Sequence, residues 1–451
     1  MKKKAKSKEV KVPKIKSVVI KIDKMPEFTK KEPLSMTVVK PKIKVLWWSD
    51  FLRHTGFGNV AEEIVSRLYA TGKYEFAIIG INHMGVPYCT PSSDYYHLKD
   101  IPVYPAFTGG PNSSLFGYDV VGDFLKTQKF DVFFALQDSF NLIPLKNDII
   151  EARKKRKFKY ILYFPVDGGV KEEWVEDGIK IADIPVTYTE YGVKEIEKYN
   201  KFINLKVIPH GIDLAKFYPF KTEEERNTFR MEHFNIGPET FLITNVNRNQ
   251  PRKDLPRMIL AFGEFCKRNR DIKAKLYLHC ISNDGAGHKL HEFTKQYLPR
   301  ELHERIVMPS ASSMGGNGVP VAILNKVYGA SDIITSTTLG EGWGLSTGEA
   351  MACKTPVVMP NNSASPALIG ENEERGYLVK CGGDINNYFV QRYDNELMRP
   401  LTDIHDLISI WEHIYRHPNE AKLKAEEAYK WIQNYTWDII VKRWEDILDA
   451  N

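Results

Sequence analysis

The sequence predicts an α/β protein built from two doubly wound parallel sheets. The chain has 451 residues, which is too long for one ordinary core and sufficient for two α/β domains with a tail. Buried-strand signals alternate with amphipathic helix signals in both halves, which favours parallel sheets with right-handed crossovers. With 43% hydrophobic and 27% charged residues, the composition is that of a globular protein.

The first series of elements predicts a domain over residues 43–205. It begins at Lys44-Val45-Leu46-Trp47-Trp48, an apolar run typical of a buried strand. The pattern then predicts one helix and three strands, over residues 59–69, 75–81, 131–136 and 160–164 respectively.

A second series predicts another domain over residues 206–428, joined to the first near residues 206–211. It contains an amphipathic helix over residues 255–268. Its predicted strands cover residues 241–246, 275–280, 306–308, 333–336 and 356–359. Residues 429–451 are expected to form a separate closing helix.

The first 42 residues are expected to form a basic flexible tail. Residues 1–44 hold 15 lysines against four acidic residues, so the rest of the chain is negatively charged overall. The tail can contact phosphate, an anionic lipid surface, or nothing specific, whereas the acidic body disfavours a broad nucleic-acid-binding face. No apolar run approaches the roughly 20 residues of a membrane span, and no secretory signal follows the lysines, so we expect a cytoplasmic protein.

The five cysteines are scattered and have no C-x-x-C spacing. An odd number without metal-ligand spacing predicts neither a disulfide framework nor a zinc site.

A first glycine-rich loop follows the first predicted strand. Gly56-Phe57-Gly58-Asn59-Val60-Ala61 fits G-x-G-x-x-[GA], a turn whose amides and helix dipole can meet a phosphate. A dinucleotide-binding enzyme would also need an acidic residue at the end of the second strand, and residues 79–82 supply none. Gly56 and Gly58 are therefore candidate donor-binding residues, with close packing of the helix on the sheet as the alternative.

The most informative segment lies in the second half. After the strand at residues 333–336 comes Glu341-Gly342-Trp343-Gly344-Leu345-Ser346-Thr347-Gly348-Glu349, a glycine turn that opens a helix. Amides of such a turn and the positive end of the helix suit an oxygen-rich anionic ligand. We expect Glu349 to accept a pair of hydroxyls and Glu341 to lie nearer the reacting end. Capping of the helix dipole by Glu349 is the alternative.

This segment resembles the E-x7-E signature of the family 4 glycosyltransferases. Residues 207–219 are similar to the family's interdomain stretch, residues 247–253 to its "gR…eKg" stretch, and residues 356–358 to its "PVv" stretch. The resemblance runs in order through residues 43–451. It implies the GT-B architecture of two facing Rossmann-like domains, with a final helix that crosses back to the N-terminal domain. It also implies retaining transfer of a hexose from a nucleotide-diphosphate sugar to an acceptor hydroxyl of a glycan, lipid or protein.

The resemblance assigns roles to residues of the second half. Arg248 and Lys253 are expected to neutralise the departing diphosphate, which is how fixed cations lower the barrier of such a transfer. Surface ion pairs are the alternative for both residues. Glu349, Gly342, Trp343, Gly344 and Leu345 are expected to bind the donor, and Glu341 to act in catalysis. No Asp-x-Asp triplet occurs, so we expect no metal and no cofactor beyond the donor substrate.

The match weakens in the first half. Where many family members have a histidine, residues 163–169 offer Asp167, which either orients the acceptor hydroxyl or is only a turn residue. His210 replaces the more usual asparagine and is expected to be structural. No general base can be named with the same support.

The donor base, the sugar and the acceptor are not determined by these motifs, because loops such as residues 88–114 and 309–318 would select them. Two alternatives stay open: an enzyme that glycosylates modified DNA bases, which the acidic body disfavours, and a sugar-nucleotide-binding protein without catalysis. Glu341, Glu349, Arg248 and Lys253 favour an enzyme.

Overall fold

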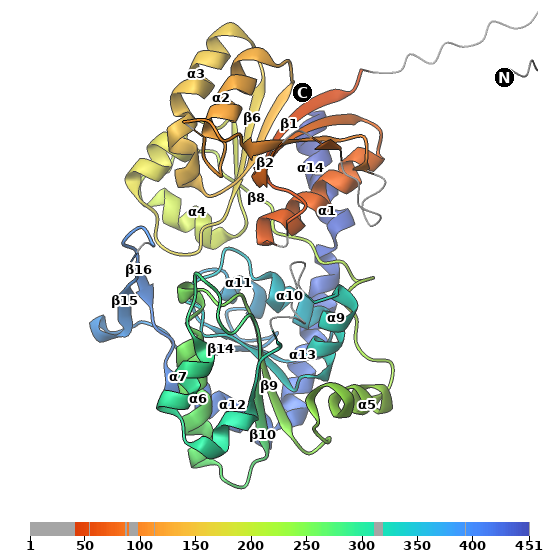
Figure 1. The fold of residues 1–451 in the computed structure, drawn as a ribbon, viewed down its shortest axis with the longest axis vertical. Helices are drawn as coiled ribbons and strands as arrows, with labels where there is room; N and C mark the ends of the chain where they lie inside the picture. The colour runs from red at the N-terminus through yellow and green to blue at the C-terminus, as the bar shows by residue number, and fades with distance from the viewer. Residues whose placement is uncertain are drawn as a thin grey trace, which may run out of the picture. The chain divides into compact units, whose positions relative to one another are not determined.

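The computed structural model describes residues 41–450, except residues 54, 86–87, 90–97, 112, 311–318 and 393. Residues 42–451 form one compact unit that holds two α/β sheets (Figure 1). Nearly all of the expected tail and most of the loop at residues 309–318 lie outside the described residues.

The first sheet has eight strands in the order β3-β4-β2-β1-β5-β6-β7-β8. Seven of them run parallel, and the short β3 pairs antiparallel with β4. The strands are β1 (Ile43–Asp50), β2 (Tyr74–Met84), β3 (Tyr88–Cys89), β4 (Pro102–Phe107), β5 (Val132–Leu136), β6 (Lys159–Phe164), β7 (Ile184–Thr187) and β8 (Lys206–Val207).

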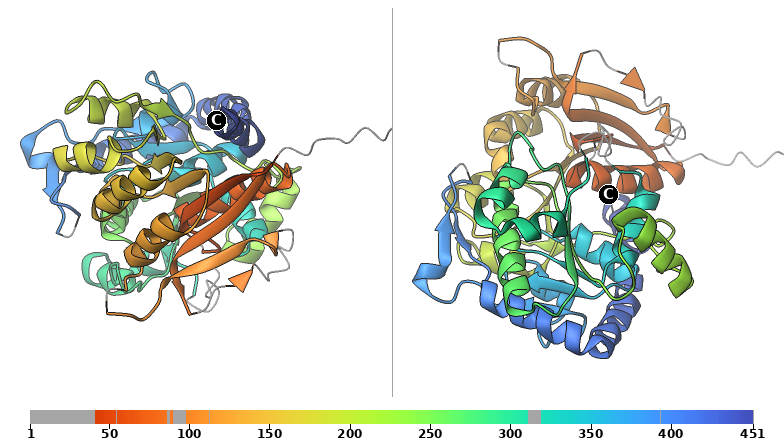
Figure 2. Two further views of the ribbon diagram at one scale, coloured as in Figure 1. Left: turned by 90° about the horizontal axis from the view of Figure 1, so that it is seen from above. Right: turned by 60° about the horizontal axis from the view of Figure 1, so that its bottom comes forward.

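Helices cover both faces of this sheet, as the views in Figures 1 and 2 show. They are α1 (Gly56–Ala70), α2 (Tyr118–Thr127), η2 (Ser139–Leu145), α3 (Lys146–Lys155), η3 (Trp174–Ile179) and α4 (Glu190–Glu197). The side-chain pattern of β1 shows why helices pack on both faces of the sheet. Its side chains alternate between faces, so Val45 and Trp47 join one core cluster, and Leu46 and Trp48 join another.

The second sheet has six parallel strands in the order β11-β10-β9-β12-β13-β14. They are β9 (Phe241–Val246), β10 (Ala274–His279), β11 (Ile306–Val307), β12 (Ile333–Thr335), β13 (Val357–Pro360) and β14 (Tyr377–Val379). The helices are α5 (Glu223–Phe234), η4 (Pro251–Lys253), α6 (Leu255–Arg268), α7 (Leu290–Tyr297), η5 (Arg300–Arg305), α9 (Val321–Ala330), α10 (Leu345–Ala352), α11 (Ser365–Ile369), η6 (Ile385–Asn387) and α12 (Ile404–Arg416). The predicted pair of doubly wound parallel sheets is confirmed.

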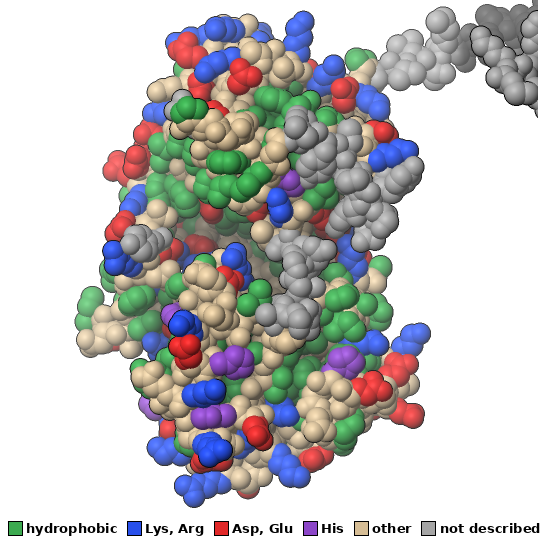
Figure 3. Space-filling view, in the orientation of Figure 1, with side chains coloured by type: hydrophobic (Ala, Val, Ile, Leu, Met, Phe, Trp, Pro, Cys, Tyr) green, Lys and Arg blue, Asp and Glu red, His purple; other side chains and the backbone are tan. Residues whose placement is uncertain are grey.

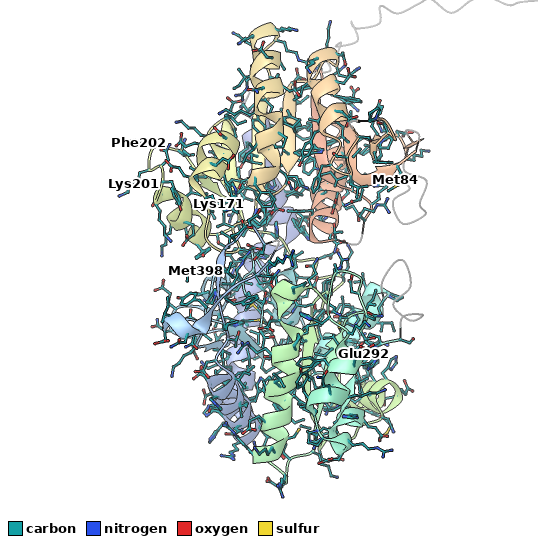
Figure 4. The ribbon with its side chains drawn as sticks, turned by 60° about the vertical axis from the view of Figure 1, so that its left-hand side comes forward. Met84, Lys171, Lys201, Phe202, Glu292 and Met398 are labelled. Carbon is teal, nitrogen blue, oxygen red and sulfur yellow. The ribbon has the colours of Figure 1, made fainter. Side chains whose placement is uncertain are left out.

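A small antiparallel hairpin, which the sequence pattern did not predict, follows the second sheet. It consists of β15 (Tyr388–Val390) and β16 (Met398–Pro400) and forms a sheet of its own. Figure 4 shows Met398 on its outer face, on the same side of the molecule as Lys171 from the first half.

The chain ends in α13 (Pro418–Ile432), η7 (Gln433–Tyr435) and α14 (Trp437–Asp449). Helix α14 packs on α1, where Asp438 accepts a 2.8 Å hydrogen bond from Arg67. Tyr74 at the start of β2 donates to Asp449 at 2.6 Å. The predicted return of the last helix to the first half is thus confirmed, although the short turn η7 interrupts the segment expected as one helix.

Two further sequence-based expectations can be compared with the described residues. Within them, no helix is long and apolar enough to cross a bilayer. Cys266, Cys280, Cys353 and Cys381 are free thiols, in line with the expected lack of a disulfide framework.

Candidate active site

A cleft of about 1200 Å³ lies between the two sheets, and Figure 3 shows the surface hollowed there. Parallel strands place their carboxyl ends at one edge, and the loops after those ends line the cleft. Asp50 is the last residue of β1, Asp138 and Asp167 follow β5 and β6, and Arg248 and Glu341 follow β9 and β12. This volume exceeds that of most small-molecule pockets, which is about 300 to 1000 Å³, so the cleft can hold a large ligand.

The glycine turn before α10 forms one wall. Gly344 has a φ of 96°, a conformation that favours glycine, and the helix begins at the next residue. No side chain caps α10, so its first amides and its positive end face the cleft, where Gly344, Leu345 and Ser346 line the wall. Gly342 is needed for another reason, because a Cβ there would come 2.6 Å from the Cβ of Pro165.

Glu349 lies in α10 and lines the same cleft. Burial raises its pKa to about 7, and the Tyr328 hydroxyl donates to its Oε2 at 2.5 Å. Tyr328 lies in α9, 21 residues before Glu349, so no short motif joins the two residues. The Tyr328 hydroxyl orients one carboxyl oxygen of Glu349, and the other oxygen has no hydrogen bond with any described residue.

Glu341 lies beside two cations of the turn η4. Lys253 donates to its Oε1, and the Arg252 guanidinium is 3.9 Å from its Oε2. Burial disfavours the Glu341 carboxylate, but the two cations outweigh burial and keep its pKa below the ordinary value. Burial lowers the pKa of Lys253, which Glu341 opposes. Lys253, which was expected to neutralise the diphosphate, thus lies in a buried ion pair with Glu341.

Arg248 also lines the cleft and is far more accessible than Lys253. Its side chain is 59% exposed, and Nε donates to Asp284 at 2.8 Å. Among the described residues its ion-pair partner is Asp284, whereas Lys253 is paired with Glu341. The structure thus places the two predicted cations in one cleft, with different partners.

Trp343 lines the cleft, and so does one of the two glycines of the first glycine-rich loop. The Trp343 ring is buried and lies 6.4 Å from His210 and 5.9 Å from Tyr435, centre to centre. Gly56 lines the cleft, whereas Gly58 is not among its lining residues. The Gly58 amide donates to Thr55 Oγ1 at 3.0 Å, and a Cβ there would collide with the Arg53 carbonyl. Close packing therefore accounts for Gly58.

Asp167 is clasped by two arginines. Arg399 of β16 donates to its Oδ1 at 3.0 Å and to its main-chain oxygen at 2.7 Å, and Arg252 lies 3.3 Å from its Oδ2. Burial disfavours the carboxylate, yet the arginines hold its pKa below the ordinary value. Arg399 is 2% exposed and also donates to both oxygens of Asp394. Sequence reasoning missed Arg399, because a lone arginine in a short strand carries no motif.

Asp138 was also missed by the sequence analysis. It follows β5 and lines the cleft, and burial together with the Asp167 charge raises its pKa to about 7. Its position just after a buried strand was the one sequence signal that could have predicted Asp138 as a residue of the cleft. His210, expected to be structural, is buried, and its Nδ1 lies 2.7 Å from the Tyr163 hydroxyl. Burial lowers the His210 pKa to about 3, so it is uncharged.

The chain is similar in sequence to known proteins over part of its length. Residues 227–391 match the family model "Glycosyl transferases group 1". Among curated relatives, the D-inositol 3-phosphate glycosyltransferase of Actinosynnema mirum is 28% identical over 164 residues, which are 36% of this chain and 37% of the relative. A probable sucrose-phosphate synthase of Thermosipho melanesiensis is 24% identical over 280 residues, which are 60% and 55% of the two chains. The chain thus spans about half the length of the curated relatives it matches, or less.

Solved structures are similar over almost the whole chain. The sucrose-phosphate synthase of Thermosynechococcus elongatus superposes with a TM-score of 0.68 at 14% identity, covering 91% of this chain and 99% of that one. The Anabaena protein HepE, in complex with UDP and glucose, has a TM-score of 0.66 at 14% identity and covers 91% and 100%. These likenesses show a common fold.

Proposed function

Residues 227–391 belong to the glycosyl transferases group 1 family and the chain has the GT-B fold, and from this premise we propose that it is a retaining glycosyltransferase. It would move a hexose from a nucleotide-diphosphate sugar to an acceptor hydroxyl. One observation carries the proposal: the open start of α10, the Glu349 carboxyl and the cations Arg252 and Lys253 meet in one cleft.

The donor is proposed to lie against the second half of the chain, which we take as the nucleotide-binding domain over residues 206–428. Glu349 would accept hydrogen bonds from the ribose hydroxyls, with Tyr328 fixing its orientation. The diphosphate would lie at the first amides of α10, beside Gly344 and Leu345. A UDP-sugar is the first donor to test, since HepE is solved with UDP-glucose.

The leaving group is the point at which charge develops. As the bond from the sugar to the diphosphate breaks, its electrons pass to a phosphate oxygen, and fixed cations stabilise that charge. Lys253 is buried at this place and Arg252 lies next to it, while Arg248 would approach from the rim. Arg252 is an addition to the pair of cations that the motif predicts.

The proposal is tested by donor binding and hydrolysis. UDP-, GDP- and ADP-glucose are titrated by calorimetry and then incubated with the protein, and release of the nucleoside diphosphate is followed by chromatography. One of the donors is expected to bind and to be hydrolysed slowly, with loss of binding in Glu349→Ala. Absence of binding by every donor refutes the proposed function, and binding without hydrolysis or transfer favours a non-catalytic sugar-nucleotide-binding protein.

A further inference from the structure

The proposed function leaves the acceptor unidentified, and the charges of the cleft bear on this question. The lining residues that the structure describes divide sharply between the two halves. All four lysines and arginines, Arg248, Arg252, Lys253 and Arg399, come from the second half. The first half contributes three carboxylates, Asp50, Asp138 and Asp167, and no lysine or arginine among the described lining residues.

Each of the four cations already has an acidic partner. Arg248 is paired with Asp284, Lys253 with Glu341, and Arg399 with both Asp394 and Asp167. Arg252 lies between Asp167 and Glu341. Arg248, Arg252 and Lys253 lie on the proposed donor side and Arg399 is held by two aspartates, so the described lining of the first half offers a phosphorylated acceptor no cation of its own.

The three carboxylates of that side are not equivalent. Both oxygens of Asp167 are held by arginines, as described above. The Asp50 oxygens accept hydrogen bonds from the Thr55 hydroxyl at 2.6 Å and from the Asn82 amide at 3.2 Å. The Asp138 side chain has no hydrogen bond or ion pair with any described residue, although it faces the cleft.

The surface beside Asp138 is apolar and aromatic. Phe140 and Trp174 pack with their ring centres 5.0 Å apart and line the cleft together with Val170. Leu397, from the loop of the β15–β16 hairpin, also lines the cleft. It belongs to the second half of the chain but packs on a core cluster of the first half. An apolar shelf next to one free carboxylate suits the face of a sugar ring and one of its hydroxyls.

We propose that the acceptor is an uncharged polyol or sugar, not a phosphorylated one, and that Asp138 accepts the hydrogen bond of its attacking hydroxyl. This inference rests on the proposed function. It sets the chain apart from relatives whose names specify phosphorylated compounds, because burying a phosphate against Asp50, Asp138 and Asp167 without a free cation is unfavourable. A nucleic-acid acceptor is disfavoured for the same reason.

The first experiment compares Asp138→Asn with the parent, using the donor found above. Water is then the attacking molecule, and slow donor hydrolysis is measured from pH 5.5 to 8.5. We expect at least a tenfold lower hydrolysis rate in the variant. In the parent the rate should rise as pH passes through about 7, and the variant should lose this rise. The charged and titratable groups facing Asp138 are Asp50, Asp167, Arg252, Arg399 and Tyr188.

Two controls separate this role from misfolding and from the proposed function. UDP affinity should be unchanged in Asp138→Asn, because the residue is not placed at the donor. Asp123→Asn, at an exposed aspartate of α2, should match the parent in every measurement. Hydrolysis within threefold of the parent, or an unaltered pH profile, overturns the role of Asp138. If the parent binds no donor, the proposed function itself fails.

The second experiment tests the charge of the acceptor with matched pairs: glucose and glucose 6-phosphate, fructose and fructose 6-phosphate, and inositol and inositol 3-phosphate. Transfer and competition with donor hydrolysis are both measured. The neutral member should be the better acceptor or competitor by at least tenfold in kcat/KM or in inhibition. A phosphorylated member that equals or exceeds its neutral partner, or a panel in which no neutral compound acts, overturns the proposal.

Discussion

Replacing Lys253 by methionine is the sharpest test of the charged centre. The ammonium is the closest partner of Glu341, and both side chains are largely buried, at 10% and 20% exposed. Removing one partner of a buried ion pair leaves an uncompensated charge and typically costs about 3 to 5 kcal/mol of stability. Because Arg252 stays 3.9 Å from Glu341, we expect the lower end of this range.

Turnover should fall as well, for a separate reason. One preorganised group that stabilises a developing charge contributes about 2 to 4 kcal/mol to the transition state, which is roughly a 30- to 1000-fold change in kcat. The double variant Lys253→Met/Glu341→Gln removes both charges, so it should regain most of the stability and none of the turnover. The free energy of unfolding is obtained from urea denaturation, and kcat at saturating donor.

A matched surface pair provides the control. Lys442 lies 3.0 Å from Glu445 on α14, with its side chain 61% exposed, and Lys442→Met should cost no more than about 1 kcal/mol. If Lys253→Met loses as little stability as this control and keeps kcat within threefold, the buried pair has no role in transfer. If the double variant is as unstable as the single one, loss of packing and not of charge explains the effect.

Four further predictions concern the same cleft. Donor affinity should rise as pH increases through about 7, because ionised Glu349 accepts the ribose hydroxyls better; a Glu349→Gln variant that keeps this rise in calorimetry contradicts the assignment. The raised Glu349 pKa also means that the folded protein binds this proton more tightly than the unfolded chain, so its contribution to stability should decline between about pH 4.5 and 7, and Glu349→Gln should flatten the urea midpoint over that window. Arg248→Ala should lower kcat without lowering stability by more than about 1 kcal/mol, since the Arg248 side chain is 59% exposed; equal kcat in variant and parent removes Arg248 from the diphosphate site. Transfer should persist in excess EDTA, since Arg252 and Lys253 are proposed to balance the charge of the diphosphate, and its loss on chelation would refute this.

The sequence predicted the second half of the fold more fully than the first. Residues 241–246 and 255–268 were placed with the bounds that β9 and α6 have, because a continuous apolar run and a 3.6-residue period are local signals. Strands β3, β4, β7 and β8 of the first sheet and β14 of the second were missed. Each is short and carries a proline or an edge position, and their pairing is decided by distant neighbours.

One wall of the candidate site could likewise be predicted from the sequence better than the other. The residues of the proposed donor wall are close in sequence, so the spacing of Glu341 and Glu349 could be recognised without a structure. The opposite wall is assembled from Asp138, Asp167 and Arg399, whose partners are up to 232 residues apart. No local pattern predicts such a contact, and the hairpin that supplies Arg399 had no recognisable period.

Arg252 connects the proposed donor wall, with Glu341, to the opposite wall, with Asp167. Its guanidinium donates to the Gly340 carbonyl and lies near carboxylates of both halves, Asp167 and Glu341. A diphosphate bound beside Arg252 would compete for this cation and weaken its hold on Asp167. Arg399 would then be the main group keeping Asp167 ionised, so the hairpin would maintain the charge of the acceptor wall while the donor occupies the other. Arg399, which lies on a hairpin outside both main sheets, would then hold Asp167 independently of the donor proposed to bind beside Arg252 and Lys253.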